Sequence, residues 1–121
     1  MGGIMSIDTA SVKSWIEQNI REIRGYDDVA VQFHISRESL RKAFVRREGI
    51  TVSRFISGVK LKRCQELLRT TDLLCFQIVY ELKLGRDDVA ARWFKRETGI
   101  TMAEYRRTQK TLTAPVVGKV A

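Results

Sequence analysis

The sequence is poor in several residue types, and each scarcity excludes a class of protein. Its 121 residues include only two cysteines, one histidine and one proline. Two cysteines cannot build a disulfide framework, so we expect Cys64 and Cys75 to be unbridged, with Cys64 buried. A single histidine, His34, without a CxxC spacing argues against a structural zinc site. The longest apolar runs, such as residues 73–76, are far too short to cross a membrane.

Targeting and catalytic signals are also missing. Residues 1–15 lack the charged and then apolar pattern of a secretory signal. Residues 1–6 fit the spacing for N-myristoylation, but a pattern this loose is often accidental, so we expect no membrane partner. There is no Gly-rich phosphate loop and no GxSxG motif. We therefore predict that the protein is not an enzyme and holds no metal or cofactor.

Two pairs of adjacent acids, at residues 27–28 and 87–88, could suggest acid–base chemistry. Both pairs precede apolar helical patterns, however. Acids at that place normally cap a helix or interact favourably with its dipole. We interpret both pairs as helix starts rather than as catalytic groups.

The chain has an excess of positive charge. Lysine and arginine total 22 against 14 aspartates and glutamates, which gives a net charge of +8. This balance favours a polyanionic partner such as nucleic acid, although a basic surface that only meets solvent is the alternative. Hydrophobic residues make up 44% of the sequence, enough for the buried core of a globular protein.

Apolar residues at helical spacing, with almost no proline to interrupt them, predict an all-α fold of about seven helices. The first series, from Val12 to Ile23, stops at Gly25. A short helix then begins at Asp27 or Asp28. Each later apolar series has its own start or stop signal. These signals are Ser36 as a cap, Gly49 and Gly99 as stops, and Thr101 with Glu104 at the spacing of a capping box.

An internal repeat is the most informative feature. Residues 44–55 match residues 94–105 at an offset of 50, with an aromatic residue followed at a fixed distance by Gly-Ile-Thr. Upstream, residues 29–35 match residues 78–84 at an offset of 49, so the second copy has one extra residue in its turn. Each copy consists of a short helix, a tight turn and a longer helix. That is the pattern of a helix-turn-helix unit.

The longer helix of each copy carries several cations around its apolar positions. Cations four residues apart, such as Arg37 and Arg41, lie on one face of a helix. The helix expected from about Val52 to Arg69 would span roughly 27 Å at 1.5 Å per residue. Two units at its ends would lie near one turn of DNA apart, roughly 34 Å, so one chain could read two successive major-groove segments.

Three groups of residues extend this pattern along the chain. They are Val29-Ala30, Phe33, Ser36, Leu40, Phe44 and Gly49; Lys60-Leu61, Cys64 and Leu67-Leu68; and Ile78, Leu82, Phe94-Lys95, Gly99-Ile100 and Tyr105-Arg106. Taken together, these motifs resemble the DNA-binding region of AraC/XylS-type bacterial transcription regulators, over about residues 6–107. The resemblance implies two helix-turn-helix subdomains joined by a long linker helix. It also implies binding to double-stranded DNA as an activator, contact with RNA polymerase, and a cytoplasmic location at the bacterial nucleoid.

The resemblance also assigns roles to individual residues. The base-reading positions are Glu38, Arg41 and Lys42 in the first unit and Asp88, Ala91 and Arg92 in the second. The phosphate contacts are Arg37, Arg46, Lys95 and Arg96. Four departures from the family pattern fall in or beside the second unit: Leu74, Lys83-Leu84, Ala90 and Met102.

We expect four segments along the chain. These are a first helix-turn-helix subdomain at 1–51, the linker helix at 52–71, a second subdomain at 72–107 and a flexible tail at 108–121. No segment is left for a small-molecule effector site. A helical protein-interaction module that has lost DNA binding is the alternative function, and the acids at residues 87–88 favour it.

Overall fold

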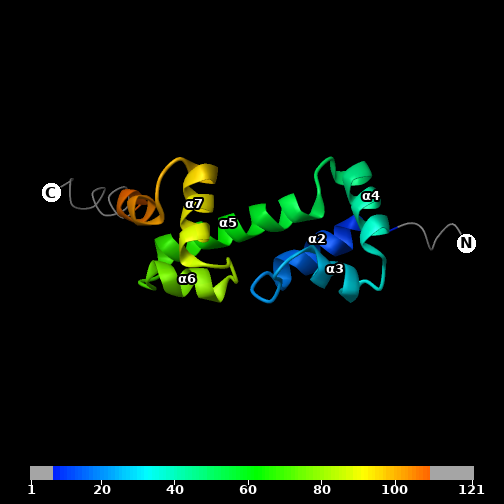
Figure 1. Ribbon diagram of the computed structural model, residues 1–121, viewed down its shortest axis with the longest axis horizontal. Helices are drawn as coiled ribbons and strands as arrows, with labels where there is room; N and C mark the ends of the chain where they lie inside the picture. Colours follow the sequence, from blue (N-terminus) through cyan, green and yellow to red (C-terminus); the bar gives the residue numbers. More distant parts are fainter. Residues whose placement is uncertain (1–6, 110–121) are drawn as a thin grey trace, which may run out of the picture. The chain divides into compact units, whose positions relative to one another are not determined.

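A computed structural model describes residues 7–109, and every regular element in that range is a helix (Figure 1). This confirms the all-α prediction. Six helices are followed by a last one that covers residues 102–109, which makes seven in the described range. The six are α2 (Thr9–Gln18), α3 (Tyr26–Gln32), α4 (Arg37–Glu48), α5 (Val52–Thr70), α6 (Cys75–Glu81) and α7 (Asp87–Thr98). Residues 108 and 109, which we expected in the tail, belong to the last helix. The rest of the expected tail, residues 110–121, and the pattern at residues 1–6 lie outside the described residues.

Side-chain caps begin helices where the sequence predicts them. The Ser36 hydroxyl accepts a hydrogen bond from the Ser39 backbone N–H at 3.1 Å, at the start of α4. Thr101 and Glu104 form the expected capping box: the hydroxyl accepts from the Glu104 N–H at 3.1 Å, and the carboxylate accepts from the Thr101 N–H at 2.9 Å. These contacts satisfy N–H groups that have no partner within the helix. Gly49 ends α4 in the left-handed conformation, as expected.

The first helix is shorter than predicted. It ends at Gln18 rather than near Gly25, since the backbone of Asn19 leaves the helical conformation (φ −116°, ψ 21°). The Asn19 side-chain amide donates a second hydrogen bond to the Trp15 carbonyl, which also accepts from the Asn19 N–H. The chain then forms a turn before α3. Ile20 and Ile23 are still buried, at 5% and 0% exposure. The apolar spacing therefore identified core residues correctly, although the backbone that carries two of them is not helical.

The described chain divides between Lys60 and Leu61 into two compact units. The division falls inside α5, which contributes to both cores. Val52 and Ile56 from its first half belong to the first core, together with residues of α2, α3 and α4. Cys64 and Leu68 from its second half belong to the second core, together with residues of α6 and α7. Burial raises the pKa of the Cys64 thiol to about 12, and neither cysteine is bridged, as predicted.

The internal repeat is visible in the packing of aromatic rings. Phe44 of α4 lies 5.8 Å, centroid to centroid, from Phe55 of α5. In the second unit, Phe94 of α7 lies at the same distance from Tyr105 of the last helix. The two pairs are related by the offset of 50 found in the sequence. Arg106, beside Tyr105, donates hydrogen bonds at 3.1 Å to the carbonyls of Leu68 and Thr71, which holds the last helix against the end of α5.

A left-handed residue that is not glycine lies in the turn of each unit, and the second turn also has Gly85 at φ 91°. His34 (φ 54°) follows α3, and Lys83 (φ 52°) follows α6. After α3, the His34 N–H donates to the Val31 carbonyl and the Ile35 N–H to the Ala30 carbonyl, both at 3.1 Å. The second turn has the equivalent pair of bonds, to Tyr80 and Val79. This is the Schellman arrangement, which normally has glycine at the left-handed position.

We predict that glycine at either of these positions will stabilise the fold. His34→Gly or Lys83→Gly should raise the free energy of unfolding by about 0.5–1 kcal/mol, because glycine adopts a positive φ without the steric cost of a Cβ atom. Urea unfolding followed by circular dichroism measures the change. Gln32→Gly is the matched control: this residue ends α3 with a helical backbone, so glycine there should destabilise. Unfolding midpoints that do not rise in either turn variant would contradict the prediction.

Candidate nucleic-acid interface

The predicted site residues of the first unit lie on the outward face of α4. Leu40 and Phe44 are completely buried on the opposite face. Because these two buried residues are four positions apart, they define the face of α4 that packs on the core. The side chains on the opposite face are the ones that can reach a ligand. All five predicted contacts are exposed, namely Arg37, Glu38, Arg41, Lys42 and Arg46.

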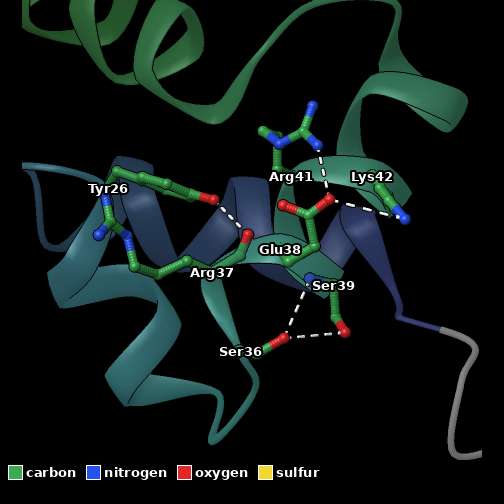
Figure 2. Close-up of polar contacts among 7 residues, drawn as sticks. All are labelled: Tyr26, Ser36, Arg37, Glu38, Ser39, Arg41 and Lys42. Carbon is green, nitrogen blue, oxygen red and sulfur yellow. Dashed lines mark hydrogen bonds and ion pairs between the residues drawn. The ribbon is translucent and has the colours of Figure 1, made fainter.

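Glu38 forms ion pairs with two of these cations at the start of α4 (Figure 2). Its Oε2 atom lies 2.7 Å from Arg41 Nη2 and 3.6 Å from Lys42 Nζ. The hydrogen bond from Arg41 lowers the pKa of Glu38, and the same bond raises that of Arg41. Glu38 and Arg41 therefore carry their charges at neutral pH. The structure thus brings together the three predicted base-reading residues of this unit.

Arg37 has a different environment from the one the sequence suggested. Its Nε atom lies 2.9 Å from Asp27 Oδ1, and its guanidinium lies 5.4 Å from the centre of the Tyr26 ring. The Tyr26 hydroxyl donates a hydrogen bond to the Arg37 carbonyl (Figure 2). These contacts join the start of α4 to the start of α3. Because the Arg37 side chain remains 69% exposed, its assignment as a phosphate contact stays a prediction.

The second unit presents α7 in the same orientation relative to its own core. Ala90 and Phe94 are buried at 1% and 0% exposure. Asp88, at the position equivalent to Glu38, accepts two hydrogen bonds from the Arg86 guanidinium, at 2.9 and 3.1 Å. Arg92 lies 3.8 Å from the same carboxylate. The contact with Arg86 lowers the pKa of Asp88. The predicted contacts of this unit are all exposed: Asp88, Ala91, Arg92, Lys95 and Arg96.

The departures from the family pattern have different structural consequences. Ala90 and Met102 are buried, at 1% and 7% exposure, and take part in the second core. Leu74 precedes α6 without an oxygen that could cap the helix, and the Gln77 side chain instead accepts from the Leu74 N–H at 2.7 Å. Lys83 occupies the left-handed turn position. The second unit keeps its fold with all of these residues in place. The departures therefore change the exposed surface beside α7 rather than the fold.

Three site residues were not identified from the sequence as members of these networks. Tyr26 and Asp27 contact Arg37 across the turn, and Arg86 binds Asp88. The contact of Arg86 could have been predicted, because Arg86 and Asp88 are opposite charges two residues apart in the sequence. The contacts between α3 and α4 could not, because they depend on the angle at which the two helices meet.

Within residues 7–109 we find neither a cluster of potential metal ligands nor a helix that could span a bilayer. Two helix pairs, each with a buried inner face and a cationic outer face, define a helix-turn-helix protein of the DNA-binding class.

Comparisons with known proteins agree with this classification. A family model described as "Helix-turn-helix domain" matches residues 29–108. The chain therefore belongs to the AraC/XylS-type helix-turn-helix family of DNA-binding transcription regulators.

Two curated relatives illustrate the similarity. The HTH-type transcriptional activator RhaS of Klebsiella pneumoniae is 26% identical over 84 residues, which cover 69% of this chain and 30% of RhaS. The uncharacterized HTH-type transcriptional regulator YfiF of Bacillus subtilis is 34% identical over 71 residues, covering 59% of this chain and 23% of YfiF. This chain thus spans less than a third of the length of either relative.

Solved structures show the same fold. An AraC-type transcriptional regulator from Chromobacterium violaceum matches with a TM-score of 0.73 and 25% identity, over 83% of this chain and 89% of that one. The DNA-binding domain of AdpA, solved in complex with a target DNA, matches with a TM-score of 0.79 and 19% identity, over 87% of this chain and 95% of that one.

Glu48 connects the end of α4 to α2. Its Oε1 atom accepts a hydrogen bond from Lys13 Nζ at 2.9 Å, and its Oε2 atom accepts from Thr9 Oγ1 at 2.7 Å. The contact with Lys13, followed by that with Thr9, lowers the pKa of Glu48. The carboxylate therefore helps to hold the candidate recognition helix on its own core.

A pH-dependent contribution to stability follows from this contact. A carboxylate whose pKa is lower in the folded than in the unfolded protein stabilises the fold above the unfolded pKa of about 4.3. This stabilisation is lost as the pH falls through the folded pKa. Glu48→Gln should therefore lower Tm at about pH 7 and reduce the difference in Tm between about pH 7 and pH 3. Glu17→Gln, on the exposed side of α2, is the control in circular dichroism melts. The same pH dependence in wild type and Glu48→Gln would contradict the prediction.

Proposed function

We propose that this chain binds double-stranded DNA at specific sequences and activates transcription. The observation that carries the proposal is the pair of cationic outward faces on α4 and α7, each on the second helix of a helix-turn-helix unit. That helix is the one whose N-terminal residues meet base edges in the major groove. Activation, contact with RNA polymerase and a cytoplasmic location at the nucleoid are part of the proposal. The similarity to RhaS, a transcriptional activator, supports the first of these.

The two units contribute differently to binding in this proposal. Arg41 supplies a guanidinium that can donate two hydrogen bonds to N7 and O6 of guanine. Glu38, 2.7 Å from it, restricts the guanidinium and can itself accept from the amino group of cytosine. At the equivalent positions the second unit has Ala91 and Asp88. Most base discrimination therefore comes from the first unit.

The second unit serves mainly to anchor the protein. Arg92, Lys95 and Arg96 are exposed along α7 and suit the phosphate backbone. Asp87 and Asp88 in the first turn favour the helix dipole but repel phosphates. The cations that follow these acids along α7 therefore provide the attraction, and they do so for any DNA sequence.

The first test is the salt dependence of DNA binding. If about six phosphates are contacted, the slope of log K against log salt should be about −5, since each contact contributes roughly −0.9. Fluorescence anisotropy with a duplex selected from a random pool gives the slope. A protein-interaction module without DNA binding would give no saturable binding or a slope near zero, and either result would overturn the proposed function.

Two substitutions separate base reading from phosphate anchoring. Arg41→Ala should cost about 1–3 kcal/mol of binding free energy and relax the preference at one base pair. Arg96→Ala should weaken binding to all sequences alike and reduce the salt slope by about one. Affinities for the selected duplex and its single-base variants measure both effects. A selected motif with more information under the second unit than under the first would contradict the division between the units.

A further inference from the structure

An apolar groove of about 480 Å³ lies on the surface of the second unit, beside α7. Its walls come from the start of α6, the first half of α7 and the start of the last helix. Asp87 is the only charged residue that lines it, and the apolar lining includes Leu74, Phe76, Ala91, Met102 and Ala103. Leu74 and Phe76 are large apolar residues that remain 54% and 56% exposed.

The repeat explains the difference between this surface and the equivalent one on the first unit. The positions of Asp87 and Ala91 correspond, at an offset of 50, to Arg37 and Arg41. Those two long side chains take part in ion pairs with Asp27 and Glu38. The short side chains of Asp87 and Ala91 cannot cover the α6 side of their helix. The same backbone therefore presents a charged network in one unit and an apolar groove in the other.

The groove borders the part of α7 that faces DNA in the proposed function. Ala91 is exposed, and it is the fifth residue of the helix. N-terminal residues of the second helix in a helix-turn-helix unit meet base edges in the major groove. The apolar group that bases present there is the C5-methyl of thymine. An acid at the rim disfavours phosphate, and it can accept a hydrogen bond from a base amino group.

We propose that this groove receives the C5-methyl group of a thymine, so that the second unit selects a T·A pair beside Ala91. The inference rests on the proposed function and names the chemistry that the second unit recognises. Selection here is by burial of a methyl group and not by paired hydrogen bonds. Its contribution is accordingly smaller than that of Arg41.

The experiment replaces thymine by uracil, which removes the methyl group and keeps the pairing edge. Each thymine of the selected duplex is replaced in turn. The half-sites are assigned beforehand: the one whose base preference Arg41→Ala relaxes belongs to the first unit, and the other belongs to the second. We expect one replacement in the half-site of the second unit to weaken binding about fourfold, the size expected for burial of one methyl group. Thymines in the half-site of the first unit are the control and should change affinity by less than about twofold.

Two further measurements distinguish the methyl group from other occupants. At the sensitive position, the protein should bind a duplex with 5-methylcytosine·guanine more tightly than one with cytosine·guanine. 5-Methylcytosine restores the C5-methyl group of thymine but keeps the hydrogen-bonding groups of cytosine. In Ala91→Ser the effect of uracil should disappear, while the salt slope stays the same.

The outcomes are separable. If the protein binds DNA with the expected salt slope but every uracil duplex binds like its thymine parent, the groove inference is wrong and the proposed function stands. If no duplex is bound, both are wrong. Sedimentation of the protein without DNA tests another occupant. If the wild type is a dimer and Phe76→Ser is a monomer, the groove binds a second copy of the chain and the inference is overturned.

Discussion

Each unit of this protein depends on a sharp reversal between two helices, which begins at a left-handed residue directly after the first helix of the pair. His34 and Lys83 hold that conformation, and two backbone hydrogen bonds at each turn close the end of the preceding helix. Without the reversal, the apolar faces of α3 and α4, or of α6 and α7, could not meet in one core. The turn therefore determines which face of α4 and α7 is left for solvent and ligand.

The long helix α5 contributes to two cores at once. Its first half places Val52 and Ile56 among the residues of the first unit, and its second half places Cys64 and Leu68 in the other. Neither unit could complete its core without its half of α5, because the short helices alone bury too few apolar side chains. Continuity of this one helix makes two small cores possible in a chain of 121 residues.

Charge distinguishes two units that share one fold. An acid stands at equivalent places in both, Glu38 and Asp88, and in each unit it binds two neighbouring cations. Around that common arrangement, the first unit has Arg37 and Arg41 where the second has Asp87 and Ala91. Substitutions on the exposed face cost the fold little, because the buried face determines the packing. Two copies of one motif could therefore acquire different surfaces without losing either core.

The sequence by itself determined the helices, most of their caps, the repeat and the identity of the buried residues. It did so because these features depend on neighbours within one or two helical turns: Ser36 caps through Ser39, and the spacing of Leu40 and Phe44 defines a face. The same spacing placed the predicted site residues on the outer surface of α4 and α7. Whether they meet DNA stays a prediction.

Only the tertiary structure decided how these side chains are held. The binding of Arg37 by Tyr26 and Asp27 could not be read from local patterns. Nor could the contact of Glu48 with Thr9 and Lys13. The contacts of Arg37 and Glu48 join residues 10 to 39 positions apart in the chain, so they exist only once helices meet at a particular angle. The groove beside α7 has the same origin, because its walls come from three helices and its opening depends on the size of side chains that face one another only in the folded unit.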